Sequence, residues 1–284
     1  MVNAIKPGES WLKIQGEQPG LMEELNGSAT RITLNGKRHY TTPLPCGPAP
    51  SVTTILSETA SEANKKKLEM WSKNNPGVKE AAAERGTAIH YGMEQYLKGN
   101  KTPVINDEYK DFWSGMPAIL DKFDEVLWAE TPVDPRFDFT VGADDVARVW
   151  GCDADGRAWA GAPDIIGVVG GKLTLADLKT SVKPYSRNWP KDLEKGSQEW
   201  RDLLAGNMKF KKACKQIGAY ALAIEQTLGM KVQQGAILVS TPSRTQVFKI
   251  SRRFLDSLQE DWYKLVAEYY KQIDEYGSYD PDLI

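Results

Sequence analysis

A Gly-Gly pair between two short apolar runs is the feature of this sequence that most constrains its fold. Gly170 and Gly171 lie at the centre of the stretch from Gly161 to Ser181, which reads GAPDIIGVVGGKLTLADLKTS. A two-residue hairpin turn of type I′ needs positive φ at both central positions, which glycine adopts freely. The stretch therefore predicts a β-hairpin in which the numbers of paired residues sum to 341.

This register places two carboxylates opposite each other. Asp164 and Asp177 are expected to face one another with Cβ atoms roughly 5 Å apart. Two cross-strand pairs make the rest of that face apolar, so a helix is expected to cover it: Ile166 with Leu175, and Val168 with Leu173. Two acids on such a face indicate a cation site, and Mg²⁺ and Mn²⁺ take oxygen ligands of this kind. Lys179 points the same way, and the alternative is a charged strand end with Lys179 as an ordinary salt-bridge partner.

Two further segments have helical periodicity and carry polar residues at i, i+4 spacing. The segment from Glu84 to Gly99 places His90 and Glu94 on one face, and its apolar residues recur at helical spacing: Ala88, Ile89, Met93, Tyr96 and Leu97. A second helix, expected near 208–228, places Gln216 and Tyr220 on one face. Its apolar stripe is equally typical of a core helix with a polar rim.

The residues around the hairpin resemble a known signature. Pro163, Asp164, Asp177, Leu178 and Lys179 spell PD…D-L-K, which resembles the motif of the PD-(D/E)XK nuclease superfamily with Asp as its second acid. The resemblance implies that the two acids bind metal together with the backbone carbonyl of Leu178. It also implies that Lys179 helps to orient and activate the attacking water.

Motifs on both sides of the hairpin resemble the RecB-like branch of this superfamily. That resemblance makes His90 a metal ligand, Gln216 and Tyr220 residues that approach DNA, and Glu130 and Glu94 possible second-shell residues. From about residue 36 to 250 the chain is similar to phage-encoded exonucleases and to the mitochondrial genome maintenance exonuclease, whose corresponding region between the N-terminal motif and the metal site helps to form a helical arch.

The expected fold is α/β, with a restriction-endonuclease-like core whose mixed central sheet is flanked by helices, plus helical N-terminal and C-terminal additions. We expect one domain over residues 1–284, with an N-terminal extension (1–35), an exonuclease core (36–250) that contains a basic insertion (181–215), and a C-terminal helix (251–284). Within the core, strands near 137–150, 157–169 and 172–179 are expected to form a meander. Further elements are expected near 62–72, 79–98, 232–240, 245–250 and 253–276.

Composition limits the cofactor and the compartment. Cys46, Cys152 and Cys214 are too widely scattered for a disulfide framework or an iron–sulfur cluster, so one or two Mg²⁺ or Mn²⁺ ions are the expected cofactor. No apolar run is long enough to span a membrane and no apolar signal region is present. A soluble, intracellular protein is expected, in the cytoplasm of a bacterial or phage-infected cell.

Local rather than net charge points to a nucleic-acid partner. The net charge is −2, but residues 181–215 contain nine basic residues against four acids, interleaved with Trp189 and Trp200. Basic residues can hold phosphates and aromatic rings can stack on unpaired bases. Lys65, Lys66 and Lys67 form a second basic group. The alternative for the three lysines is a solvated helix face. The alternative for the tryptophans is that they pack back on the domain.

Together these features predict a metal-dependent DNA exonuclease with Asp164, Asp177 and Lys179 as catalytic residues. Single-stranded ends or flaps are the expected substrate, in replication, recombination or repair, with proteins of those processes as possible partners and no membrane. Two alternatives remain open: a duplex-processing or structure-specific endonuclease with the same site, and a nuclease fold retained as a DNA-binding or recombination module.

Overall fold

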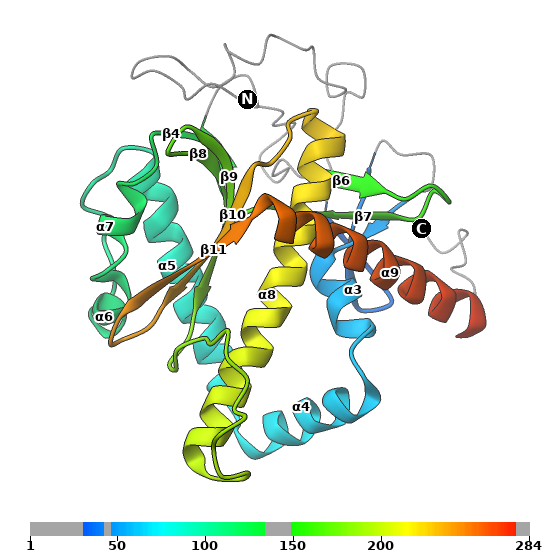
Figure 1. The fold of residues 1–284 in the computed structure, drawn as a ribbon, viewed down its shortest axis with the longest axis horizontal. Helices are drawn as coiled ribbons and strands as arrows, with labels where there is room; N and C mark the ends of the chain where they lie inside the picture. Colours follow the sequence, from blue (N-terminus) through cyan, green and yellow to red (C-terminus); the bar gives the residue numbers. More distant parts are fainter. Residues whose placement is uncertain (1–30, 43–46, 134–148, 277–284) are drawn as a thin grey trace.

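The computed structural model describes residues 31–42, 47–133 and 149–276, and its centre is a mixed β-sheet flanked by helices (Figure 1). Six strands lie in the order β11-β10-β9-β8-β4-β5. The pair β9 and β10 is parallel, and the other neighbouring pairs are antiparallel. These strands are β4 (Glu125–Ala129), β5 (Thr131–Pro132), β8 (Ile165–Val169), β9 (Lys172–Thr180), β10 (Gln234–Ser240) and β11 (Thr245–Ser251). A mixed α/β fold of this kind agrees with the expectation from sequence.

The hairpin between β8 and β9 has the predicted register. Ile166 pairs with Leu175 and Val168 with Leu173, as the sum of 341 requires. Gly170 and Gly171 have φ values of 58° and 71°, the left-handed region that the turn needs. The local turn chemistry therefore fixes which side chains of the two strands share a face.

Helices cover both faces of the sheet. On one face, Ile166, Val168, Leu173 and Leu175 of the hairpin pack against α8 (Gln198–Leu228) and α9 (Arg252–Tyr276). On the other face, Ile165, Ala176 and Leu178 pack against α5 (Val78–Leu97) and the short helices that follow it. These are η1 (Asp107–Tyr109), α6 (Lys110–Trp113) and α7 (Pro117–Leu120). The hairpin thus lies between two helical layers.

Helix α8 begins earlier than expected. Ser197 caps its N-terminus by accepting a hydrogen bond from the backbone N–H of Trp200 (3.1 Å), and Gly229 ends it in the left-handed conformation. The helix therefore starts at Gln198 rather than near residue 208. The basic segment 181–215 is accordingly a loop followed by the first half of this helix.

The expected meander has the right antiparallel pairings, β6 (Val149–Cys152) with β7 (Ala158–Gly161) and β8 with β9, but it is wrong as one continuous sheet. The single strand expected over 157–169 is two strands, β7 and β8, separated by Ala162-Pro163-Asp164. Strand β7 pairs with β6 in a separate two-stranded sheet, and β8 pairs with β4 instead. Proline lacks the N–H that a sheet ladder requires, which accounts for the break. Residues 134–148 lie outside the described part.

The first described residues form strands rather than helices, which contradicts the expected helical N-terminal addition for residues 31–35, the part of it that the structure describes. Strands β1 (Arg31–Leu34), β2 (Lys37–Tyr40) and β3 (Ala49–Pro50) make a small antiparallel sheet. Helix α3 (Val52–Glu58) follows and packs into the main core. Helix α4 (Glu62–Asn74) then runs along the edge of the molecule toward α5 with no buried residue (Figure 1). Among the described helices, none has the length and apolar character needed to cross a membrane.

Candidate metal centre

The break at Pro163 places Asp164 directly before the first residue of β8. The Asp164 carboxylate accepts a hydrogen bond from the backbone N–H of Leu178 (2.6 Å). Its backbone carbonyl accepts one from the N–H of Glu130 (2.7 Å), and the indole N–H of Trp128 donates to the carbonyl of Pro163 (3.0 Å). Strand β4 therefore holds the break in place and brings a second acid beside Asp164.

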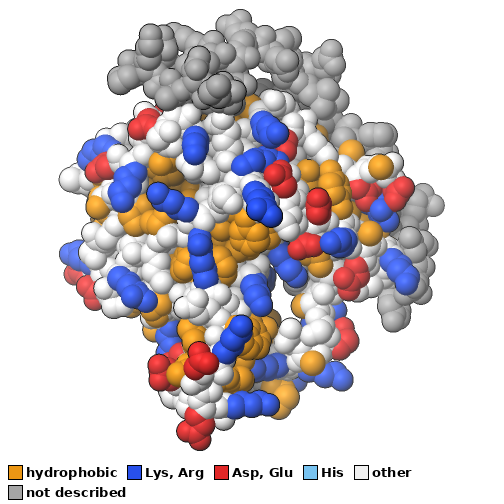
Figure 2. All heavy atoms as spheres, in the orientation of Figure 1, with side chains coloured by type: hydrophobic (Ala, Val, Ile, Leu, Met, Phe, Trp, Pro, Cys, Tyr) orange, Lys and Arg blue, Asp and Glu red, His pale blue; other side chains and the backbone are white. Residues whose placement is uncertain are grey.

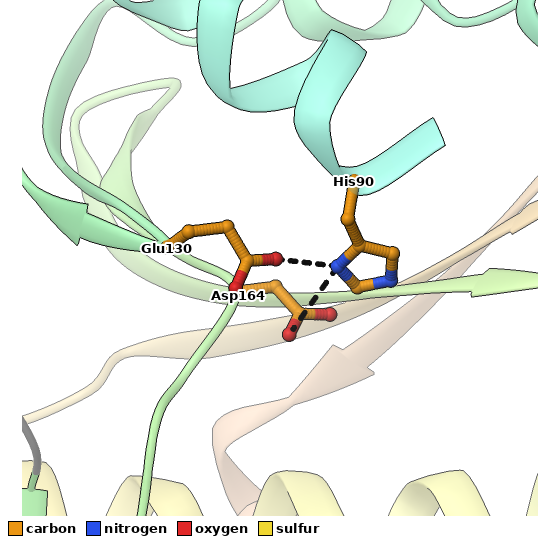
Figure 3. A group of neighbouring side chains, drawn as sticks. All are labelled: His90, Glu130 and Asp164. Atoms are coloured by element: carbon orange, nitrogen blue, oxygen red, sulfur yellow. Dashed lines mark hydrogen bonds and ion pairs between the residues drawn. The ribbon is translucent and has the colours of Figure 1, made fainter. Parts of the chain in front are cut away.

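Glu130 has a backbone conformation that is rare for a residue with a side chain. Its φ is 58°, and it follows directly after β4. Residues held in such conformations cost about 1–3 kcal/mol and gather at functional sites. Here the conformation directs the carboxylate of Glu130 toward His90 (Figure 3).

His90 lies beside the two acids but belongs to a helix rather than to the sheet. It projects from α5, and its ring Nδ1 donates to Glu130 Oε1 and lies 3.9 Å from Asp164 Oδ1 (Figure 3). Its Nε2 lies 3.1 Å from the carbonyl oxygen of Leu178. Both ring nitrogens thus face acceptors, an arrangement that suits the doubly protonated imidazolium.

The charge on His90 follows from its surroundings. Burial lowers the pKa of His90, but the charge of Asp164 and the hydrogen bond to Glu130 outweigh burial and raise it to about 9. In the metal-free protein, the positive charge of the imidazolium therefore balances part of the negative charge of the acids. A bound cation would replace that charge.

His90, Glu130 and Asp164 together could hold a metal ion. One ligand atom from each lies within 4.8 Å of the others. The carbonyl oxygen of Leu178 lies next to this cluster, 3.1 Å from His90 Nε2. Carboxylate and carbonyl oxygens with one imidazole are ligands that Mn²⁺ and Mg²⁺ accept. The sequence left open whether Glu130 contacts the metal, and the structure places it beside His90 and Asp164.

Asp177 lies behind this cluster on the face that α8 covers. It is fully buried, and neither carboxylate oxygen has a hydrogen-bond partner among the described residues. The ammonium of Lys179 is 2.7 Å from Oδ2 and forms an ion pair with it. A buried carboxylate without hydrogen bonds is costly, and it supports the assignment of a cation to this site.

The two aspartates and Lys179 shift one another's pKa values. Burial raises the pKa of Asp177 to about 6, with Lys179 opposing the shift and Asp164 adding to it. Burial likewise raises the pKa of Asp164, partly offset by His90 and Lys179. Burial would lower the pKa of Lys179, but the two aspartates raise it above its ordinary value. Lys179 is therefore an ammonium group.

Gln216 and Tyr220 do share one face of α8, as their spacing predicted. The amide of Gln216 donates to the hydroxyl of Tyr220 (3.2 Å), and both residues are buried. A Cβ atom at Gly161 would lie 2.6 Å from the Tyr220 ring, so the absence of a side chain at Gly161 lets the ring pack against β7. The charges of Asp164, Asp177 and Lys179 all act on the Tyr220 hydroxyl, which places it beside the carboxylates.

The remaining candidate residues lie outside the cluster. Glu94 pairs with Lys98 (2.7 Å), one helical turn further along α5. Lys65 pairs with Glu62 on α4 (2.9 Å), whereas Lys66 and Lys67 are exposed on the same helix. Trp189 is half-exposed in the loop before α8, with Lys211 5.1 Å from its ring centre. Cys152 and Cys214 are free thiols, and Cys46 lies outside the described part of the chain.

Divalent cations should raise the melting temperature of the protein. A cation at ten times its Kd adds about 1.4 kcal/mol to the free energy of unfolding, which corresponds to roughly 3–5 °C. Thermal unfolding with EDTA, Mg²⁺, Mn²⁺ or Ca²⁺ measures the shift. The shift should vanish in Glu130→Gln and persist in Glu94→Gln, which removes a carboxylate from the same region. An equal shift in both variants would contradict the assignment.

Comparisons with known proteins give weak structural likenesses. No known family and no curated protein sequence matches the chain. A crystal structure of SSO0001 is 18% identical over 76% of this chain and 76% of that one, with a TM-score of 0.35. A provisionally named exonuclease from Eubacterium rectale is 15% identical over 68% of this chain and 65% of that one, with a TM-score of 0.36. At these TM-scores neither likeness carries an argument about function, which therefore rests on the residues themselves.

Proposed function

We propose that this protein is a metal-dependent nuclease that hydrolyses phosphodiester bonds of DNA, and that it acts as an exonuclease on single-stranded ends or flaps. The observation that carries the proposal is the convergence of His90, Glu130 and Asp164 beside the buried pair of Asp177 and Lys179. Three acids, a carbonyl and a histidine supply ligands for Mg²⁺ or Mn²⁺, and the ammonium supplies a donor beside them.

The residues divide the chemistry between them. A bound divalent cation would supply charge stabilisation at the phosphate and lower the pKa of water. Lys179 would orient the attacking water and balance charge, because as an ammonium group it cannot act as the base. Asp177 would keep that ammonium in place, 2.7 Å away. Tyr220 and Gln216 would position the DNA backbone from α8.

The preference for single strands rests on α4 and its surroundings. Figure 2 shows an opening through the molecule, framed on one side by α4 and bordered by basic side chains. Leu68, Met70 and Trp71 on α4 are exposed, by 65%, 64% and 44%. Exposed apolar and aromatic groups beside lysines suit a strand whose bases are unpaired. A strand threaded through such an opening must enter by a free end.

The test is digestion of labelled linear single-stranded, circular single-stranded and duplex DNA with Mg²⁺, Mn²⁺ or EDTA. We expect metal-dependent loss of the linear single strand, with the circle intact and duplex cut at least about tenfold more slowly, a difference of about 1.4 kcal/mol in barrier. The variant Lys179→Ala controls for contaminating nucleases. Cleavage of the circle would make the protein an endonuclease, and no cleavage of any substrate would favour a DNA-binding module.

A further inference from the structure

A second group of basic side chains lies further along the same face of β9. Asp177 and Lys179 point toward α8, and Ser181 follows on that face at the end of the strand. The ammonium of Lys209, on α8, donates to the hydroxyl of Ser181 (3.0 Å). The ring of Tyr185 lies 5.9 Å from the same ammonium. Polar groups therefore continue along this face of β9 beyond Lys179, to Ser181 and Lys209.

Arg85 approaches the same place from α5. A Cβ atom at its neighbour Gly86 would lie 3.8 Å from the Thr180 hydroxyl, so the middle of α5 is near the end of β9. The Arg85 guanidinium lies 4.8 Å from the centre of the Phe112 ring, which supports one of its faces. Its Nε is buried and has no hydrogen-bond partner among the described residues. An oriented guanidinium with an unused donor is a ready group for an oxyanion.

This basic group has no acidic partners. Within the described part of the chain, Arg85, Lys209 and Lys212 form no ion pair, whereas Lys179 and Lys183 each pair with an aspartate. Although solvent reaches Lys209, partial burial lowers its pKa, and the charges of Arg85 and Lys183 lower it further. Burial and Lys179 lower the pKa of Lys212 in the same way. Cations gathered without acids gain free energy when an anion joins them.

We propose that Arg85 and Lys209, whose ammonium the buried Ser181 hydroxyl holds in place, form a phosphate-binding subsite that holds a phosphate of the DNA strand next to, but not at, the cleaved bond. The proposal rests on the proposed function for the identity of the ligand. Ser181 lies four residues after Asp177, roughly 13 Å along an extended strand. A single phosphate cannot reach both places, so the subsite binds a different phosphate from the one that reacts. Its ligand is either an internal phosphodiester or the terminal phosphate of the strand.

The salt dependence of binding tests the subsite without cleavage. A labelled single-stranded oligonucleotide is titrated in EDTA at several salt concentrations, and anisotropy gives the affinity. Loss of one phosphate contact lowers the slope of log K against log salt by about 0.7. We expect that change for Lys209→Gln and a slope near that of the wild type for Lys209→Arg. The matched control is Lys231→Gln, which removes an exposed lysine beyond the far end of α8.

The oligonucleotide ends distinguish the two sources of phosphate. The same sequence is compared with a 5′-phosphate, a 3′-phosphate or hydroxyls at both ends. A slope change in Lys209→Gln with all three indicates an internal phosphodiester, and a change confined to one phosphorylated end indicates a terminal phosphate. Unchanged slopes with every oligonucleotide, or an equal change in Lys231→Gln, would overturn the proposal.

Inorganic phosphate separates the subsite from the proposed function. Phosphate should raise the melting temperature of the metal-free wild type, and Lys209→Gln should remove the increase. If the wild type binds no DNA but phosphate still stabilises it through Lys209, the nuclease proposal fails while the anion site stands. If phosphate stabilises the wild type and Lys209→Gln alike and the DNA slopes are also equal, the subsite itself is refuted.

Discussion

Asp177→Asn should lower the rate of DNA cleavage at least about a thousandfold and leave DNA affinity in EDTA within about twofold. Removing a single group that stabilises transition-state charge costs about 10²–10³ in rate, and Asp177 also holds Lys179, which lies 2.7 Å away. The expected loss is confined to chemistry because Asp177 is fully buried, out of reach of a strand at the surface. Gel assays of end-labelled single strands measure the rate, and anisotropy measures the affinity.

The same variant should change the pH dependence of stability in the absence of metal. Burial raises the pKa of Asp177 to about 6, above the ordinary value for aspartate. A raised carboxyl pKa means that ionising Asp177 costs stability as the pH rises from about 4 through 6. Asp177→Asn cannot ionise, so thermal unfolding in EDTA at several pH values should show that the variant lacks this part of the fall in stability, although it also loses the ion pair with Lys179.

Lys179→Met serves as the partner experiment. It removes the ammonium and keeps a side chain of similar length, so cleavage should fall about 10²–10³-fold with binding again retained. Glu94→Gln is the control, because Glu94 pairs with Lys98 away from the cluster, and its activity should match the wild type. If either Asp177→Asn or Lys179→Met lost binding in proportion to cleavage, the division between chemistry and binding would be wrong.

The parts of the site that follow from local rules were predictable. The register of β8 and β9 depends on two adjacent glycines, and the shared face of Gln216 and Tyr220 depends on a spacing of four within one helix. Such relations span few residues, so the geometry of a turn or a helix determines them. The orientation of Lys179 toward Asp177 follows from the two-residue period of a strand in the same way.

The parts that depend on contacts between distant segments were not predictable. Glu130 reaches His90 across forty positions of sequence, and it does so through a positive φ that no residue pattern announces. The pairing of β8 with β4 depends on the break at Pro163, which reads in the sequence as an interruption of a strand and not as a change of partner. Arg85 acts electrostatically on Lys209 although the two lie on α5 and α8, which cover opposite faces of the sheet.

A glycine in α8 shows how closely the covering helices pack on the face that carries Asp177. A Cβ atom at Gly218 would lie 2.8 Å from both the Cβ and the carbonyl oxygen of Leu258 in α9. Neither atom can move without moving the backbone of α9. Gly86, in α5, is different, because the nearest atom to its Cβ would be the Thr180 hydroxyl at an ordinary 3.8 Å.

The same substitution at these two glycines should therefore have opposite effects. Alanine has a helix propensity about 1 kcal/mol better than glycine, so Gly86→Ala should leave the melting temperature equal or higher. At Gly218 the overlap outweighs that gain, and we expect Gly218→Ala to lower the free energy of unfolding by about 3 kcal/mol, or roughly 6–12 °C in melting temperature. Thermal unfolding in EDTA measures both variants. Equal stability of the two would mean that α9 can move away from α8 at little cost, and the buried environment that shifts the pKa of Asp177 would then lack its rigid cover.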